Sequence, residues 1–308
     1  MSAAATVAAL ILDDALGEPP EALHPTVWMG RAISALEPLA LKLQTPAARQ
    51  TAGICIAAGL PALTYLLTRS VLGFIPQRLR TPLEVALLST TLSMRGLAES
   101  ALSVERELEN GDLESARAQV GTFVGRDTVS LSESEVVRAA VESVAENTSD
   151  GVAAPMFYGV LFGAPGALAY KSINTLDSMI GYKHPPYTDL GHASARLDDL
   201  ANFVPSRLTA LTTAAASGHF KVALATARRF APLTVSPNAG WPEAAFAGTL
   251  GLRLGGTNTY GGTTYECPTL GTGRPPTAGD ARRAVALMRR TCALLAGLAL
   301  LYAGLRRG

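Results

Sequence analysis

An acidic run at helical spacing between residues 138 and 150 is the first part of the chain that could do chemistry. Arg138, Glu142 and Glu146 lie at i, i+4 and i+8 and so share one helix face. Asn147 and Asp150 extend this polar stretch to its end. A surface salt bridge is the ordinary interpretation of such spacing. Because the run leads directly into apolar sequence, where a solvated face would be out of place, we expect its carboxylates to hold a divalent cation.

A second polar face lies between residues 171 and 183. Lys171, Asn174, Asp177 and Ser178 are spaced i, i+3, i+6 and i+7 and fall on one side of a helix. A Lys–Asp pair facing solvent would explain the same pattern. Lysine is rare in this chain, however, and Lys171 and Lys183 lie only twelve positions apart. A lysine ammonium is a compact point charge that suits a phosphate, so the pattern favours a phosphate-binding role.

A third group precedes the apolar run FVPSRLTALTT. Arg196, Asp199 and Asn202 are spaced i, i+3 and i+6, with Asp198 on the neighbouring face and Arg207 just beyond. Two adjacent aspartates are usually both surface residues. Their position directly before an apolar helix instead indicates ligands at the edge of a membrane.

Two loops offer exposed backbone amides. They are SPNAGWPE at Ser236–Glu243, which contains Asn238, and LGGTNTYGG at Leu254–Gly262. Successive amides can hold an anion. Glycine-rich loops are weak signals, and plain turns are more common.

Composition excludes several classes of protein. The net charge of +1 lacks the basic surplus of a nucleic-acid binder. The three cysteines form no CxxC pair and imply no disulfide framework. The four histidines are too scattered to predict a zinc site, and no Walker A, GxGxxG, GxSxG or HExxH pattern occurs.

The elements that must position these side chains are apolar helices. Hydrophobic residues make up 48% of the chain and charged residues only 17%, which favours a membrane protein. Thr51–Thr68 is the clearest spanning candidate, and Gly151–Tyr170 is broken by glycine and proline, as in a re-entrant or close-packed membrane element. The other expected apolar helices are Leu83–Leu97, Leu200–Ala216, Trp241–Leu254 and Thr291–Leu305.

Residues 98–146 differ from these segments. Charged and apolar residues alternate there with helical period, and Asn110-Gly111-Asp112 predicts a turn between two helices. Ser132 and Glu135 have the spacing of a capping box at the start of a further helix. We therefore expect an all-α, polytopic integral membrane protein. It would form one domain over residues 1–308, with helices around a polar cleft and a small water-facing helical subdomain at 98–146.

Long polar strings in a fixed order identify a family resemblance. They are LDDALGEPPEALHPTVWMGR, GRDT at 125–128, AAVESVAENTSDGVAAP, AYKSINTLDSMIGYK, GHASARLDDLANFVPSRLTA, SPNAGWPEAAFAGTLGLRLGG and GD at 279–280. In these strings the chain resembles the adenosylcobinamide-phosphate synthase family of cobalamin biosynthesis, whose members are polytopic membrane enzymes. The strings cover most of the chain, and the longest are highly specific.

The resemblance implies a reaction, cosubstrates and a location. Members of the family join a carboxylate of adenosylcobyric acid to the amine of 1-aminopropan-2-yl phosphate, or of a free amino alcohol, and form an amide. A carboxylate is a poor electrophile at neutral pH, so the family couples this step to ATP. That coupling implies an acyl-phosphate intermediate, with Mg²⁺ screening the phosphate charge. The implied surroundings are the lipid bilayer of the cytoplasmic membrane and other corrinoid-pathway enzymes, with no nucleic acid.

The resemblance also gives the polar residues roles. The candidate catalytic carboxylates, which would act as bases for the attacking amine, are Glu146, Asp177, Asp198 and Asp199. The candidate Mg²⁺ ligands are Glu146, Asp150 and Asp199. Candidate clamps for phosphate or for the corrin carboxylate are Lys171, Lys183, Arg196 and Arg207. Candidate substrate-orienting amides are Asn147, Asn174, Asn202 and Asn238. Residues of the N-terminal segment that would complete the cleft are Asp13, Glu18 and His24.

Two alternatives use the same residues differently. A transporter could bind a substrate in the polar cluster at membrane depth, although no internal repeat is visible in the sequence. A non-catalytic membrane scaffold of the corrinoid pathway would use the polar strings for protein contacts.

Overall fold

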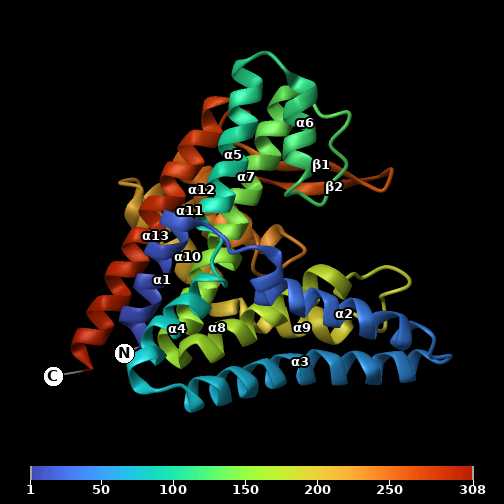
Figure 1. The fold of residues 1–308 in the computed structure, drawn as a ribbon. Coiled ribbons are helices and arrows are strands. Elements are labelled where there is room, and N and C mark those ends of the chain that lie inside the picture. The colour runs from blue at the N-terminus through green and yellow to red at the C-terminus, as the bar shows by residue number, and fades with distance from the viewer. Residues whose placement is uncertain (1, 307–308) are drawn as a thin grey trace. The chain divides into compact units, whose positions relative to one another are not determined.

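The computed structural model describes residues 2–306, which are mostly helical (Figure 1). The chain divides into two compact units. Unit 1 contains the described residues of Met1–Ser93, Ala154–Asn202 and Ala299–Gly308. Unit 2 contains Met94–Ala153 and Phe203–Leu298, and so includes the whole of the expected 98–146 subdomain. The expectation of one domain over 1–308 stays a prediction.

The helices of unit 1 come from both ends and the middle of the chain. They are α1 (Ser2–Leu16), the 3₁₀ turn Glu21–Leu23, α2 (Pro25–Leu41), α3 (Pro46–Phe74), α4 (Gln77–Ser89), α8 (Ala154–Ile180) and α9 (His192–Ala201). Helix α8 packs against α1, α2, α3, α4 and α9, and so forms the centre of this unit.

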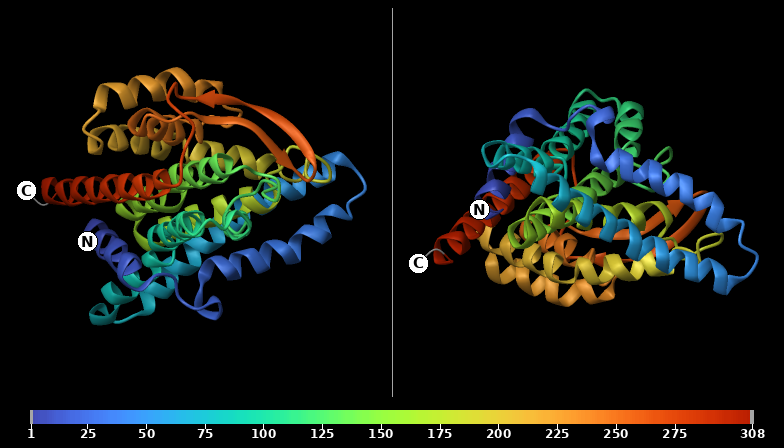
Figure 2. Two further views of the ribbon diagram at one scale, coloured as in Figure 1. Left: turned by 90° about the horizontal axis from the view of Figure 1, so that it is seen from above. Right: turned by 60° about the horizontal axis from the view of Figure 1, so that its bottom comes forward.

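Unit 2 combines helices with one hairpin. Its helices are α5 (Met94–Glu109), α6 (Leu113–Gly121), α7 (Glu133–Thr148), α10 (Phe203–Ala216), α11 (Phe220–Phe230) and α12 (Gly240–Leu250). The π-turn Ser149–Ala153, the 3₁₀ turn Ala231–Leu233 and strands β1 (Leu254–Tyr260) and β2 (Thr263–Leu270) complete it. Helix α13 (Gly279–Leu305) begins in unit 2 and ends in unit 1. In both views of Figure 2 the two strands lie side by side.

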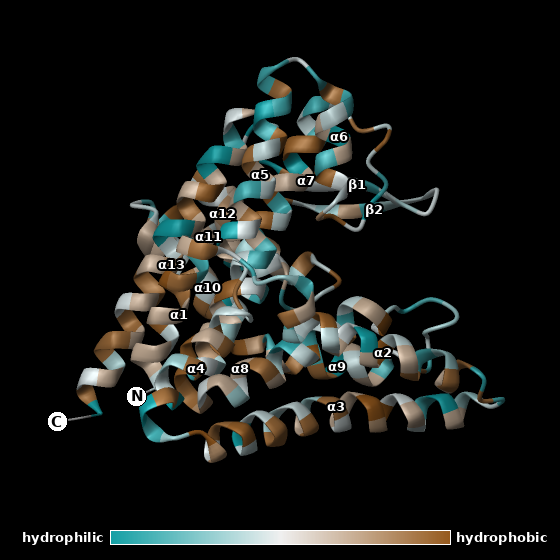
Figure 3. Ribbon diagram, viewed as in Figure 1, coloured by the Kyte–Doolittle hydropathy of each residue, from teal (hydrophilic) through white to brown (hydrophobic). Residues whose placement is uncertain are grey.

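Three helical segments in the described part of the chain are long and apolar enough to cross a membrane. They are α3, the run Glu133–Ile180 and α13. Only 17% of the apolar window of α3 is buried inside the protein, so most of its apolar side chains face outward, as a lipid-contacting helix requires. Figure 3 shows α3 coloured as hydrophobic over most of its length. These features confirm the expected all-α membrane fold.

A glycine of α3 allows this helix to pack closely against the backbone at Leu190. A Cβ atom at Gly53 would lie 2.1 Å from the backbone oxygen of Leu190, whereas nothing lies within 4 Å of a Cβ at Gly59 on the same helix. We therefore expect Gly53→Ala to cost about 1–3 kcal/mol of stability through overpacking, and Gly59→Ala to cost far less. Thermal melts of both variants in detergent test this. Equal melting temperatures would contradict the close packing of α3.

Three expected helices had wrong bounds. The expected helix Leu200–Ala216 is two helices, because α9 ends at Ala201 and α10 begins at Phe203. The expected helix Leu83–Leu97 is interrupted, because α4 ends at Ser89 and α5 begins at Met94. Thr90 and Thr91 donate their hydroxyls to the carbonyls of Leu87 and Leu88, at 2.8 and 2.7 Å. Such local bonds compete with continuation of the helix.

The expected helix Trp241–Leu254 is also too long. Helix α12 ends at Leu250, where Gly251 adopts the left-handed conformation with φ of 66°. Glycine is the usual residue at such a helix end, because a side chain would be strained there.

The segment expected to be broken or close-packed, Gly151–Tyr170, shows both features. It begins in a π-turn, and α8 has a non-helical residue at Gly163, with φ of 68°. A Cβ atom at Gly159 would lie 2.9 Å from the Thr6 hydroxyl. Small residues of this kind let membrane helices approach closely.

Helix α7 is the core of unit 2. Every residue from 136 to 145 is buried, and α7 packs against α5, α6, α12 and β1. Its apolar side packs with Val104, Ala116 and Val120 of α5 and α6. The charged surfaces of α5 and α6 therefore face water, whereas α7 is enclosed. The expected turn at Asn110–Asp112 and the Ser132–Glu135 capping box are both confirmed.

The glycine-rich segment Leu254–Gly262 is strand and hairpin turn, not the loop we expected. β1 and β2 pair antiparallel, with Tyr260 opposite Thr263. The two residues between them, Gly261 and Gly262, have φ of 54° and 79°. A two-residue hairpin turn with positive φ at both positions favours Gly-Gly, so the sequence YGGT carried a hairpin signal.

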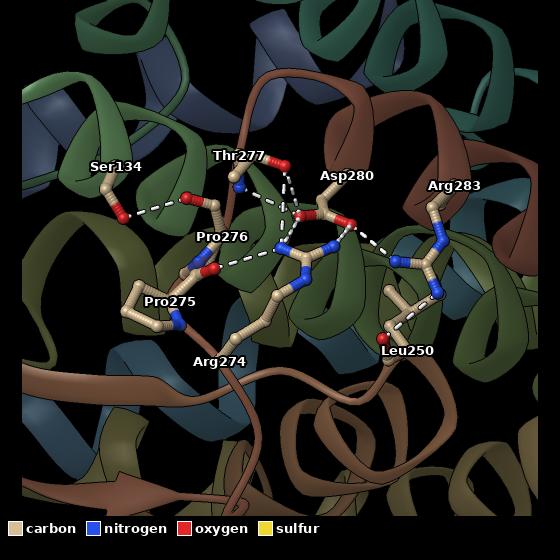
Figure 4. A network of polar contacts seen from close by, with 8 residues as sticks. All are labelled: Ser134, Leu250, Arg274, Pro275, Pro276, Thr277, Asp280 and Arg283. Carbon is tan, nitrogen blue, oxygen red and sulfur yellow. Dashed lines mark hydrogen bonds and ion pairs between the residues drawn. The ribbon is translucent and has the colours of Figure 1, made fainter.

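A carboxylate anchors the connection from the hairpin to α13 (Figure 4). Asp280, whose side chain is 1% exposed, pairs with Arg274 and Arg283, each at 2.6 Å. It also accepts the backbone N–H of Thr277 at 2.8 Å, and Arg283 donates to the carbonyl of Leu250 at 3.0 Å. This network fixes the start of α13 against the end of α12.

Candidate functional site

A cavity of about 420 Å³ in unit 2 combines charges of both signs. Its charged lining residues are Arg126, Glu142, Glu146 and Glu243. Polar groups from Ser143, Asn147, Thr234, Ser236, Asn258, Tyr260 and Cys267 complete the polar part of the wall. Two sequence-predicted residues, Glu146 and Asn147, therefore do line a cavity.

Two of these charged residues form a buried ion pair. Arg126 Nη2 lies 2.6 Å from Glu142 Oε2, and the two side chains are only 12% and 6% exposed. Arg126 also donates to Asn258 Oδ1 at 2.8 Å. The Glu142 carboxylate raises the pKa of Arg126 against the opposing effect of burial, so this guanidinium is a fixed positive charge.

Helix α7 holds the hairpin beside this pair through two residues one turn apart. Arg138 donates to the backbone oxygens of Gly255 and Thr257. Glu142 Oε1 accepts the N–H of Gly255 at 2.6 Å. The amides of Gly261 and Gly262 donate to the Asp127 carboxylate, at 3.2 and 2.8 Å. The glycine-rich segment thus does bind anions, but these anions are the protein's own carboxylates.

Glu243 is the group in this cavity whose protonation is most perturbed. Burial raises its pKa well above the usual range, and the negative charges of Glu146 and Glu142 act in the same direction. Arg126 opposes them only partly. A carboxyl group with a raised pKa in a cavity can accept a proton near neutral pH, which is the property of a general base.

The loop before α12 sets the position of Glu243. A Cβ atom at Gly240 would lie 2.5 Å from the Thr234 hydroxyl, so only glycine fits at the start of this helix. Arg207 donates to Asn238 Oδ1 at 3.1 Å and to the Pro237 carbonyl at 3.3 Å, and its guanidinium stacks over Phe203. Two residues predicted separately as substrate-binding, Arg207 and Asn238, are therefore in contact, and their hydrogen bond helps to hold this loop in place.

In unit 1 a second cavity, of about 300 Å³, brings three predicted residues together: Glu18, His24 and Lys171. His24 Nε2 lies 3.7 Å from Glu18 Oε2, and His24 Nδ1 accepts the N–H of Thr26 at 3.3 Å. Burial lowers the pKa of His24, and the Lys171 charge lowers it further, although Glu18 opposes this. The lowered pKa favours the neutral imidazole of His24.

A third cavity, of about 290 Å³, lies between the end of α8 and α9. Lys183, Arg196 and Asp199 line it together with His192. Arg196 Nη1 lies 3.9 Å from Asp199 Oδ2, and its side chain is 72% exposed. Water screens such an exposed pair, so it adds little to stability.

The remaining predicted residues of unit 1 are more enclosed. Burial raises the pKa of Asp198, and the amide side chains of Asn202 and Asn174 partly offset this. Asn202 is fully buried and accepts the hydroxyl of Tyr170 at 2.8 Å. Asp13 is buried in α1, and Asp177 is half-buried near the end of α8.

The predicted magnesium ligands are divided between the two units of the chain. Glu146 and Asp150 belong to unit 2, whereas Asp199 belongs to unit 1 and faces Arg196. Within residues 2–306, no three His, Cys, Asp or Glu side chains gather in a metal-binding arrangement. The magnesium site stays a prediction, and we assign no catalytic step to a resident metal ion.

Sequence reasoning missed two residues of the unit 2 cavity, Arg126 and Glu243. Arg126 lies in the string GRDT, and Glu243 ends the string SPNAGWPE. Both strings stand out in the sequence, but neither residue has a charged residue three or four positions away that would mark a shared helix face. Only the packing of α7 and α12 brings them to the same cavity as Glu142.

Comparison with known proteins gives a consistent result over nearly the whole chain. The model of the CobD/Cbib protein family matches residues 6–288. A "Cobalamin biosynthesis protein CobD" of Chromobacterium violaceum is 43% identical, covering 95% of this chain and 94% of the relative.

Relatives with the same name in other bacteria show similar identity and coverage. The Klebsiella pneumoniae protein is 41% identical and covers 94% of this chain and 93% of its own length. The Halalkalibacterium halodurans protein is 40% identical, and the match covers 93% of this chain and 92% of the relative. No solved structure matches significantly. The chain belongs to the CobD/Cbib protein family.

Proposed function

We propose that this protein acts in cobalamin biosynthesis as a multi-pass enzyme of the cell membrane, an acid–amine ligase. It joins a carboxylate of adenosylcobyric acid to the amine of (R)-1-aminopropan-2-yl phosphate, or of a related amino alcohol, and gives adenosylcobinamide phosphate. Membership of the CobD/Cbib family over residues 6–288 supports the pathway. The three membrane-capable helices support the location.

The observation that carries the reaction class is the unit 2 cavity, in which Glu243 has a raised pKa and Arg126 is a fixed cation. Amide formation requires an amine without its extra proton. In the proposed mechanism ATP phosphorylates the corrinoid carboxylate, and ADP leaves. The amine nitrogen then attacks the acyl carbon, and phosphate departs as the C–N bond forms. Glu243 accepts the proton that the nitrogen loses.

The fixed groups around Glu243 would assist this step without reacting. Arg126 is held by Glu142, and its positive charge moderates the build-up of negative charge when Glu243 is ionised. Asn147, Ser143 and Ser236 offer hydrogen-bonding groups along the same wall. We propose that Mg²⁺ enters bound to the ATP phosphates and keeps several of its water ligands.

One assay tests this function. Purified protein in lipid nanodiscs is given adenosylcobyric acid, aminopropanol phosphate and Mg-ATP, and the product is followed by mass spectrometry. We expect the cobinamide phosphate mass only when all components are present, and its loss when EDTA is added. Amide formation without ATP would contradict the ligase mechanism. Corrinoid flux into proteoliposomes without amide formation would instead favour the transporter alternative.

A further inference from the structure

We propose that the unit 1 cavity bounded by Glu18, His24, Thr26, Thr90, Ser93 and Lys171 binds a phosphate monoester or polyphosphate group. This inference rests on the proposed function, because both ATP and aminopropanol phosphate carry such a group. It adds a location for phosphate recognition within unit 1, built from segments that lie far apart in the sequence.

The wall of the cavity supplies donors from separate elements. Lys171 comes from the middle of α8, and His24 and Thr26 come from the start of α2. His24 Nδ1 accepts the Thr26 N–H, so the imidazole proton lies on Nε2. At 3.7 Å from the Glu18 carboxylate, this Nε2–H is beyond hydrogen-bond range of it.

A buried hydroxyl completes the donor set. Thr26 Oγ1 is a buried atom, and it has no hydrogen-bond partner among the residues that the structure describes. A buried hydroxyl normally has a partner, because leaving it without one costs free energy. Thr26 lines the cavity, and rotation to another staggered χ1 rotamer can bring its hydroxyl to a ligand bound there.

The geometry suits phosphate better than carboxylate. The lining residues offer three donors, an ammonium, an imidazole N–H and a hydroxyl, as many as a phosphate monoester has terminal oxygens, whereas a carboxylate has only two. The positive end of the α2 dipole lies at the same place, since α2 begins at Pro25. Glu18 and Glu21 also line the cavity, and because both are exposed, water weakens their repulsion of a bound anion. The volume of about 300 Å³ is at the lower end of the range for small-molecule sites.

The test measures binding without turnover. Dissociation constants of inorganic phosphate, ATP, aminopropanol phosphate and unphosphorylated aminopropanol are measured by calorimetry on the full-length protein in nanodiscs. The variants are Lys171→Gln and the isosteric Thr26→Val, and the control is Lys42→Gln, which alters an exposed lysine of the same unit. Melting curves establish that each variant is folded, and Thr26→Val carries the test if Lys171→Gln does not fold.

We expect Lys171→Gln to weaken binding of a phosphate-bearing ligand roughly 10- to 100-fold, the loss typical of a charge-assisted hydrogen bond. Thr26→Val should weaken it about 3- to 10-fold, as expected for one neutral hydrogen bond. Lys42→Gln and the unphosphorylated amino alcohol should show no change. An effect on ATP alone identifies a nucleotide site, and an effect on aminopropanol phosphate alone identifies the amine-substrate site; either supports the proposal.

Unchanged affinities of all three phosphate ligands in folded Lys171→Gln and Thr26→Val would overturn it. The two proposals can fail separately. Lysine-dependent phosphate binding by a protein that forms no amide would leave this site standing and remove the ligase function. Normal amide formation with unchanged phosphate binding in both variants would leave the ligase function standing and remove this phosphate site.

Discussion

Glu243→Gln is expected to lower the rate of amide formation by roughly 10²- to 10⁴-fold, the usual contribution of a general base. Glutamine keeps the size of the side chain but cannot accept the proton of the amine. The protein should remain folded, because the substitution removes a charge that Glu146 and Glu142 already disfavour. The rate is measured in the mass-detected ligation assay, at saturating concentrations of all substrates.

The matched control is Glu266→Gln, which changes an exposed glutamate on β2 of the same unit. It should ligate at the wild-type rate. The pH profile gives a second test. Since a base works only when ionised and the pKa of Glu243 is raised, the wild-type rate should increase with pH through a pKa above the ordinary carboxyl range. A Glu243→Gln enzyme with wild-type rate and pH profile would remove Glu243 from the mechanism.

Arg126→Met is expected to reduce stability by about 3–5 kcal/mol, the usual cost of removing one partner of a buried ion pair. The Glu142 side chain, which is only 6% exposed, would lose its ion-pair partner, and Asn258 would lose a 2.8 Å hydrogen bond. The loss is measured as a shift in the unfolding midpoint of purified protein in detergent. The control Arg253→Met, at an exposed arginine of the same unit, should change stability by less than about 0.5 kcal/mol.

A double variant separates charge from packing. Adding Glu142→Gln to Arg126→Met removes the unpaired carboxylate, so we expect part of the lost stability to return. If the double variant is less stable than Arg126→Met by the full cost of a second independent substitution, the two side chains do not interact as the 2.6 Å contact indicates.

Features that depend on neighbouring residues could be predicted from the sequence. The apolar segment in α3, the turn at Asn110–Asp112 and the Ser132–Glu135 capping box all follow from spacing over a few residues. Helical spacing also placed Glu142 and Glu146 correctly on the α7 segment that lines the unit 2 cavity. The polar strings identified the family, because they are local patterns as well.

The partners of these residues could not be predicted in the same way. Spacing suggested that Glu142 pairs with Arg138 one turn away, but Arg138 bonds to the hairpin backbone and Glu142 pairs with Arg126. Likewise, the sequence marked Lys171 and His24 as polar positions without showing that they share a cavity.

The sequence by itself determined where most of the helices lie, which segments are apolar enough for a membrane and which helix faces carry charge. Only the tertiary structure decided which faces meet, and so which carboxylate is buried beside which cation. The physical reason is that helical periodicity fixes directions within one element. Contacts between elements instead depend on the packing of many distant side chains, such as the approach of α12 to α7 that places Glu243 beside Glu142 and Glu146.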